Sequence, residues 1–256
     1  MWDHISFGML TFLVVAGFIA SFVDSVVGGG GLISVPALLL TGIPTPIALG
    51  TNKLAGTLSS FTSTISFIRS GKVNFGLVKY LFPLSLLGSA TGVLIVKMIP
   101  SDFLKPIVVV MLIVVTIYTL FKKNWGDKST YQGLTKKVAV LGAITALGMG
   151  FYDGFFGPGT GSFLLFIFLT LGFDFVGAAG NAKVLNFGSN LAGMVTFMSL
   201  GMVNYAYGIP MGIAMILGAL VGSRVAIRKG ASYVRPLFIS VSVLMIGKQL
   251  WDLVSK

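Results

Sequence analysis

VDSVVGGGG, residues 23–31, and YDGFFGPGTG, residues 152–161, decide the fold of this chain. Each segment interrupts an apolar run with glycines shortly after a lone aspartate, which is Asp24 in the first segment and Asp153 in the second. Glycine lacks the side chain that keeps a helix regular, so a helix should stop and restart at each interruption. The chain therefore carries the same break twice.

The duplication extends well beyond the glycines. ALGTNK ends at Lys53 and AAGNAK ends at Lys183, 130 positions later. A single period over so many positions is the mark of a repeated architecture. The same offset of 130 relates Val73-Asn74 to Val203-Asn204, Gly88 and Gly92 to Gly218 and Gly222, and Lys105-Pro106 to Arg235-Pro236. Asn74 and Asn204 are typical of residues that cap helix starts.

Composition indicates a membrane protein. Hydrophobic residues make up 55% of the 256 residues and charged residues only 10%, which is more apolar surface than a soluble core of this size could hide. Segments that cross a bilayer must be helical, because lipid offers no partner for free backbone groups. We therefore predict an all-α polytopic membrane protein whose first apolar run is a permanent span rather than a cleaved signal peptide.

Ten apolar segments are expected, five in each half. The short segments at 32–43 and 162–173 would rise only about 18 Å as helices, against a hydrocarbon core of about 30 Å. If each completes a crossing with its glycines, the chain has ten spans; if each is re-entrant, it has eight. The other segments are expected at 5–24, 47–68, 75–98, 103–121, 138–155, 177–198, 203–227 and 233–251.

The basic residues predict the orientation. They gather around three connections, at residues 69–79, 122–137 and 224–235, which the positive-inside rule makes cytoplasmic. Corresponding connections of the other half are poor in basic residues, so the halves should be inverted repeats with five spans each. This predicts a first repeat at 1–125, a basic cytoplasmic linker at 126–137, a second repeat at 138–256, and both termini outside the cytoplasm. The same rule explains the net charge of +11 without nucleic acid as a partner.

The paired breaks favour an anion-binding site. A restarting helix presents free N–H groups and the positive end of its dipole, and transporters place such interrupted helices near the midplane. Close helix packing is the alternative explanation for the glycines. Hydroxyl and amide side chains, such as Ser59, also cluster beside the charges. The candidate substrate-binding residues are Gly28, Gly29, Gly30, Gly31, Asn52, Lys53, Gly157, Gly159, Gly161, Asn181, Lys183, Asn186 and Asn190.

The charged residues inside the apolar runs leave two roles open. A charge at such depth costs about 2.5 to 3.5 kcal/mol on insertion scales, so Lys53 and Lys183 are expected to act, and to lie near the same level. They could supply positive charge to an anion, form structural ion pairs with Asp24 or Asp153, or extend to the membrane interface. The aspartates could carry protons or serve only as counter-charges.

Residues 22–53, FVDSVVGGGGLISVPALLLTGIPTPIALGTNK, resemble the signature of the TauE/SafE family, also called the sulfite exporter or TSUP family of bacterial membrane transporters. GFFGPGTGSFL, residues 154–164, and the region of AAGNAK also resemble the usual family form. The resemblance covers nearly the whole chain. It implies a multi-spanning inner-membrane permease for small sulfur-containing or organic anions, such as sulfite, sulfoacetate or thiosulfate.

The sequence thus predicts a secondary transporter of a small anion that works by alternating access, with coupled protons as a further partner. A passive anion channel is the alternative, followed by a non-transporting membrane scaffold. The chain has one histidine, no cysteine and no glutamate, so no catalytic constellation, metal site or cofactor is expected. The sequence gives no indication of oligomeric state.

Overall fold

The computed structural model describes residues 7–96 and 126–230, together with scattered positions beyond residue 230. Every regular element in this part is helical, which confirms the all-α prediction. The segment expected at 103–121, and most of that at 233–251, lies outside the described residues. The helices are α1 (Phe7–Val27), α2 (Gly31–Leu39), α3 (Thr45–Arg69), α4 (Phe75–Ile95), α6 (Lys136–Phe155), α7 (Thr160–Thr170), α8 (Phe175–Ser199) and α9 (Tyr205–Lys229).

Helix boundaries follow the local chemistry of the sequence. The expected breaks are present, since α1 ends at Val27 before the glycines and α6 ends at Phe155 before its own. Asn74 and Asn204 cap α4 and α9, each accepting a hydrogen bond of 3.1 Å from the backbone N–H three residues later. The interpretation of these two asparagines as caps is confirmed.

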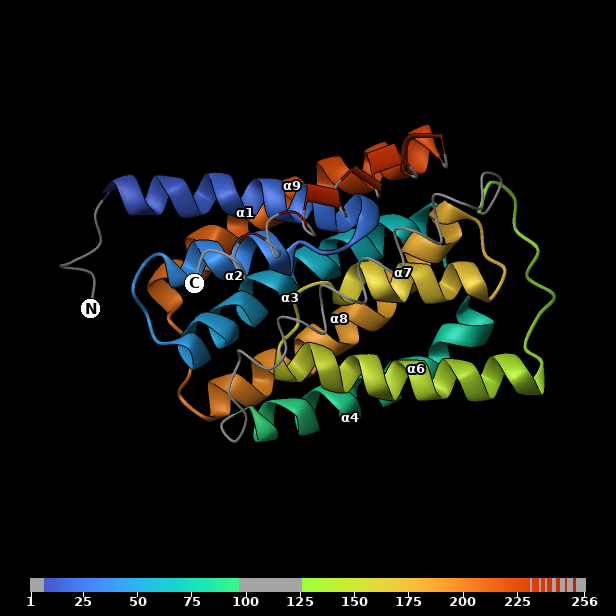
Figure 1. Cartoon of the computed structure of the whole chain (residues 1–256), viewed down its shortest axis with the longest axis horizontal. Helices are drawn as coiled ribbons and strands as arrows, with labels where there is room; N and C mark the ends of the chain where they lie inside the picture. The colour runs from blue at the N-terminus through green and yellow to red at the C-terminus, as the bar shows by residue number, and fades with distance from the viewer. Residues whose placement is uncertain are drawn as a thin grey trace.

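Four of the described helices, α1, α4, α6 and α9, are long and apolar enough to cross a membrane. α3 and α8 have 25 residues each but carry many buried polar side chains, as expected of helices in the interior of a bundle. Figure 1 shows α1 beside α9 along one edge and α4 beside α6 along the opposite edge, with α3 and α8 between them. The chain is therefore built as a polytopic membrane protein.

The two halves pack against each other through reciprocal helix contacts, α4 with α6 and α9 with α1. A Cβ added at Gly88 or Gly92 of α4 would collide with the backbone of α6, and one at Gly218 or Gly222 of α9 would collide with that of α1. Glycine is needed at these four positions because the helix backbones approach closely, as membrane helices commonly do at small residues. The first helix of each half thus packs against the fourth helix of the other half.

Contacts in register give the directions of the helices. α1 runs parallel to α3, as the successive pairs Ser21–Ser59 and Ser25–Ser63 show. It also runs parallel to α9, because Gly218 lies against Phe18 and Gly222 against Phe22. α8 runs parallel to α4, and α4 to α6, whereas α3 and α8 are antiparallel. The long helices α1, α3 and α4 therefore point opposite to their equivalents α6, α8 and α9, which is the relation that an inverted repeat requires.

The short helices return the chain between parallel neighbours. Because α1 and α3 run in the same direction, the chain must go back between them, and α2 lies in that return. α2 has nine residues and rises only about 14 Å, so the glycines before it and the turn after it supply the rest. α7 has the same place between α6 and α8. This geometry agrees with the alternative in which the short segments complete crossings.

Candidate functional site

The two glycine breaks lie against each other in the centre of the molecule. A Cβ added at Gly28 would overlap the backbone of Gly161, and one at Gly31 would lie 3.2 Å from Cα of Pro158. Gly28 and Gly29 in one break, and Gly157 and Gly159 in the other, have φ between 78° and 91°. Side chains are disfavoured in this left-handed region, so glycine is required here both by backbone conformation and by space.

Two buried ion pairs join the halves. Lys53 of α3 lies 2.8 Å (Nζ to Oδ1) from Asp153 of α6. Lys183 of α8 lies 2.5 Å (Nζ to Oδ2) from Asp24 of α1. Each lysine therefore pairs with the aspartate of the other half, and the predicted structural ion pairs are present.

The two carboxylates differ in their remaining partners. Asp24 Oδ1 accepts a hydrogen bond of 3.2 Å from the backbone N–H of Gly30, inside its own glycine break. Asp153 Oδ2 accepts one of 2.5 Å from the hydroxyl of Ser189 on α8. The side chain of Asp24 is 17% exposed, whereas that of Asp153 is 4% exposed. Asp24 is thus the more accessible member of the two.

The lysines do not lie at the same level, and that expectation is wrong. Along α3, the side chain of Lys53 lies beside Gly193 of α8, whereas Thr64 donates a hydrogen bond to the carbonyl of Lys183. Lys53 and Thr64 are separated by three turns of α3, about 16 Å along the helix. The backbones of the two lysines are therefore far apart along the antiparallel pair α3 and α8, although their side chains reach carboxylates that line one cavity.

A small cavity of about 40 Å³ lies between the ion pairs. Its walls combine both carboxylates, both glycine breaks and amide or hydroxyl side chains of α2, α3 and α8. It brings together eleven predicted site residues, namely Asp24, Gly29, Gly30, Gly31, Asn52, Asp153, Gly157, Gly159, Gly161, Asn186 and Asn190. Lys53 and Lys183 are held behind the carboxylates that line it, and Gly28 supports the wall against Gly161.

Asn181 has a different place from the one expected. Its Oδ1 accepts a hydrogen bond of 2.8 Å from the backbone N–H of Asn74, and its Nδ2 donates to the carbonyl of Gly177. In the other half, the hydroxyl of Thr51 accepts from the backbone N–H of Asn204 in the same way. Asn181 therefore tethers the start of α4 and is not part of the cavity wall.

Other wall residues were absent from the predicted set. Ser34, Gly56, Thr160 and Met215 line the cavity, as does Ser59, which the sequence indicated only as one of many polar residues. Ser34 donates a hydrogen bond of 2.6 Å to Oδ1 of Asn52, which links α2 to α3. Ser34 follows the glycine run by three positions, so its helical spacing from Gly31 was a usable signal.

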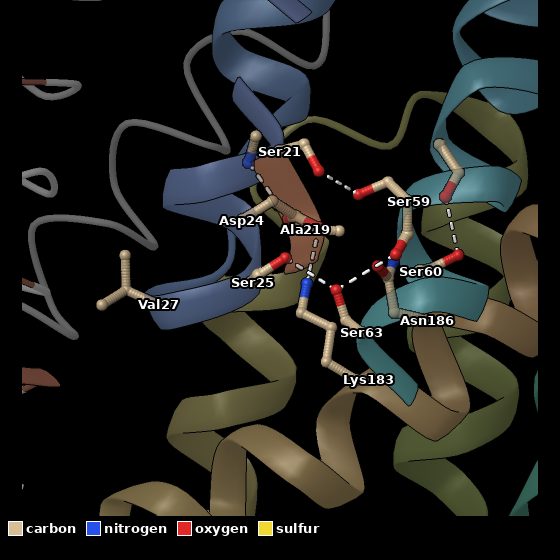
Figure 2. Close-up of polar contacts among 12 residues, drawn as sticks. Ser21, Asp24, Ser25, Val27, Ser59, Ser60, Ser63, Lys183, Asn186 and Ala219 are labelled. Carbon is tan, nitrogen blue, oxygen red and sulfur yellow. Dashed lines mark hydrogen bonds and ion pairs between the residues drawn. The ribbon is translucent and has the colours of Figure 1, made fainter. Parts of the chain in front are cut away.

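A ladder of serines attaches α1 to α3 beside this site. Figure 2 shows Ser21 and Ser25 of α1 pointing toward Ser59 and Ser63 of α3, while Lys183 extends from α8 to Asp24. The Oγ atoms are 2.6 Å apart in both serine pairs. Interhelical hydrogen bonds of this kind are worth about 0.6 kcal/mol each in membranes, so the ladder fixes register more than it adds stability.

Among the described residues, no group of three histidines, cysteines or acidic residues could hold a metal ion. The site instead contains backbone N–H groups, amide and hydroxyl side chains, and two lysine–aspartate ion pairs. Groups of this kind suit a charged ligand.

Comparison with known proteins agrees with this arrangement. The sequence model of the family described as Sulfite exporter TauE/SafE matches residues 13–248. The chain belongs to the TauE/SafE family. A probable membrane transporter protein of Sinorhizobium, ORF9, is 42% identical to it over 98% of this chain and 95% of its own length. TauE/SafE membership confirms the resemblance seen in the sequence.

Further relatives of this TauE/SafE chain come from other bacteria. A probable membrane transporter protein of Haemophilus influenzae is 38% identical over 97% of both chains. The probable membrane transporter protein YfcA of Escherichia coli is 37% identical over 95% of this chain and 90% of its own length. No solved structure matches the chain. Family and relatives together support a multi-pass membrane transporter.

Proposed function

We propose that this protein is a secondary transporter of a small anion, and not an enzyme, and that it binds its substrate in the cavity between the two halves. The observation that carries the proposal is the composition of that cavity, which both glycine breaks and both inter-repeat ion pairs surround. Backbone N–H groups at the restarts of α2 and α7 provide anion donors, and the amides of Asn52, Asn186 and Asn190 replace hydration water.

The charges around the cavity connect anion binding to protons. Two lysines and two aspartates cancel formally, so an added anion meets the carboxylates of Asp24 and Asp153 at close range. Like charges at such distances repel strongly in a protected interior. Binding therefore requires that one carboxylate takes up a proton, which frees its lysine to face the anion. Asp24, the more exposed carboxylate, is the one that protons from solvent can reach more easily.

The position of the ion pairs supports alternating access. Lys53–Asp153 joins α3 to α6 and Lys183–Asp24 joins α8 to α1, so both pairs join one half to the other. Opening one pair while the other stays closed exposes the cavity to one side of the membrane at a time. The two halves rock about the contact between the glycine breaks, where no side chain intervenes.

We assign the substrate to small sulfur-containing or organic anions, such as sulfite, thiosulfate or sulfoacetate. The family description supports sulfite and its chemical relatives. A cavity of about 40 Å³ suits an anion of few heavy atoms. The protein is assigned to the bacterial inner membrane, with the basic connections in the cytoplasm and both termini outside it.

Anion flux into proteoliposomes tests the function. The purified chain is reconstituted, and the uptake of sulfite, thiosulfate, sulfoacetate and acetate is measured with and without an imposed pH gradient. Saturable uptake of at least one anion, accelerated by the gradient, is expected. Currents far above transporter turnover, independent of the gradient, would establish a channel instead. Uptake no faster than in protein-free liposomes, for every anion, would refute both.

Asp24→Asn tests the assignment of the proton. The amide keeps the shape of the side chain but cannot release or bind a proton near neutral pH, so transport by this variant should lose its dependence on the pH gradient. Asp153→Asn serves as the matched comparison and should alter the gradient dependence less. If Asp24→Asn transports with the pH profile of the unmodified chain, the proton is carried elsewhere.

A further inference from the structure

A second hollow, separate from the central cavity, lies between the C-terminal ends of α3 and α9. Its volume is about 410 Å³, roughly ten times that of the central cavity. Its lining consists of three arginines, two hydroxyl residues and four apolar residues. These are Arg69, Arg224 and Arg228; Thr62 and Ser66; and Phe61, Ile65, Leu220 and Ile227.

The three arginines line one hollow. Arg69 lies in the last turn of α3, and Arg224 and Arg228 share one face of the last two turns of α9. Like charges four residues apart on a helix repel each other. No ion pair to these arginines is found within the part of the chain that the structure describes. An anion between them would relieve that repulsion.

Apart from the arginines and the two hydroxyl residues, the lining of the hollow is apolar, and it opens on the outer surface of the bundle. Phe61 is 49% exposed, and Val221 and Leu217 continue the exposed apolar surface along α9 toward its middle. Free inorganic anions gain nothing from such a surface. A ligand that fits the whole hollow has a charged phosphate at one end and a hydrocarbon chain at the other.

The opposite end of the molecule provides an internal comparison. At the sequence offset of 130, Ser199 and Leu94 are the equivalents of Arg69 and Arg224; the sequence equivalent of Arg228 is Met98, which lies outside the described residues. The fold therefore does not need arginine here. The positive-inside rule accounts for basic residues at one end, but not for the convergence of three arginines above one apolar groove.

We propose that the groove between α3 and α9 is a binding site for an anionic phospholipid. The guanidinium groups of Arg69, Arg224 and Arg228 bind the phosphate, which their planar donor geometry suits. The hydroxyls of Thr62 and Ser66 donate to carbonyls within α3, so their oxygens can accept hydrogen bonds from hydroxyl groups of the headgroup. An acyl chain lies along Phe61, Ile65 and Leu220. Basic pockets between membrane helices commonly hold such lipids. This site is independent of the transport proposal.

Native mass spectrometry of the full chain tests the site. The protein is released from nanodiscs that contain equal amounts of phosphatidylglycerol and phosphatidylcholine, and the retained lipids are counted. Several-fold enrichment of phosphatidylglycerol is expected, and the double variant Arg224→Gln/Arg228→Gln should reduce it to near parity. Lys72→Gln and Lys229→Gln, which remove basic residues outside the hollow, should keep the enrichment. Equal enrichment in the arginine variant and the unmodified chain would overturn the proposal.

Two further measurements test the acyl-chain contact and distinguish a lipid from a free anion. If the double variant does not fold, Phe61→Ser removes part of the apolar floor and keeps all three charges; undiminished retention of phosphatidylglycerol by this variant would exclude the acyl-chain contact. Inorganic phosphate is then added at millimolar concentration to the unmodified protein. A rise in melting temperature equal to that given by phosphatidylglycerol would identify a free-anion site and overturn the lipid assignment.

Discussion

Lys53 combines an observed structural role, its ion pair with Asp153, with the proposed role in anion binding. Burial of its ammonium group costs free energy, and Asp153 offsets that cost at 2.8 Å. Removing one member of a buried pair leaves an uncompensated charge, which destabilises proteins by about 3 to 5 kcal/mol. Substitution of the lysine alone therefore cannot separate its effect on folding from its effect on transport.

A double variant separates the two effects. Lys53→Gln alone should lower the unfolding temperature strongly, and Lys53→Gln/Asp153→Asn should recover most of that loss because no lone charge remains buried. Anion uptake should stay abolished in both, since the lysine no longer faces the substrate. Unfolding is measured in detergent and uptake in proteoliposomes, and Lys183→Gln/Asp24→Asn gives the equivalent data for the other pair. Normal uptake by the double variants would leave the lysines a purely structural role.

Gly28 permits a second prediction at the residue scale. Gly28→Ala combines an unfavourable φ of +78° with overlap on the backbone of Gly161. Gly201→Ala has a similar φ of +67° but open space, and Gly148→Ala has open space without positive φ. Strain alone costs about 1 to 3 kcal/mol. We expect Gly148→Ala to be tolerated, Gly201→Ala to lose stability in that range, and Gly28→Ala to lose more stability and all uptake. Equal melting temperatures for the Gly28 and Gly201 variants would rule out the close contact.

At the residue scale, the sequence identified most residues of the cavity but did not show where each side chain lies. The lone charges, the glycine runs and the asparagines of α8 were recognisable because such residues are costly or unusual in apolar helices. Eleven of the predicted residues meet at one cavity. Asn181 could not be distinguished from its neighbours, because only the tertiary structure shows that its side chain reaches the start of α4. Ser34 and Met215 gave no signal comparable to a buried charge.

At the scale of the helix, small residues decide which elements approach each other. α4 meets α6, and α9 meets α1, at equivalent glycines. The sequence predicted the helices themselves to within a few residues at most ends, because apolar length, glycine and asparagine caps are local signals. It did not predict which helices pair, since that depends on surfaces far apart in the chain.

Because the two helix contacts are equivalent, alanine at equivalent glycines should cause similar losses of stability. Gly88→Ala and Gly218→Ala each place a methyl group against the backbone of a neighbouring helix, so each should cost about 1 to 3 kcal/mol in stability. The two losses should be similar, because the contacts are equivalent. Thermal unfolding in detergent measures them, with Gly148→Ala as the control in open space. A large loss at one position only would show that the two interfaces are not equivalent.

At the scale of the whole molecule, the opposite directions of equivalent helices predict opposite exposure of equivalent loops. The chain has no cysteine, so a single introduced cysteine reports its own accessibility. Lys72→Cys, after α3, should react with a membrane-impermeant maleimide only from the cytoplasmic side. Ser199→Cys, at the end of α8, should react only from the other side. Labelling of both from the same side of oriented vesicles would contradict the inverted arrangement.

At this scale the uneven distribution of basic residues between equivalent loops predicts inverted repeats, and the opposite directions of the equivalent long helices are consistent with that prediction. The pairing of each lysine with the aspartate of the other half was not predictable. Whether Lys53 pairs with Asp24 of its own half or with Asp153 of the other depends on how the halves interlock, and the sequence left both possibilities open. The levels of the lysines were mispredicted for the same reason, since the antiparallel pairing of α3 and α8 separates two positions that the repeat makes equivalent.

Translation order matters for a chain whose ion pairs join its two halves. Asp24 is synthesised 159 positions before Lys183, the residue that neutralises it, and Lys53 likewise precedes Asp153. Until the second half is inserted, the first therefore exposes a cation and an anion to lipid without their final partners. A nascent chain truncated at the linker would be a poor membrane protein and a natural target for quality-control proteases. The exchanged pairs thus make completion of the polypeptide a condition for its stability.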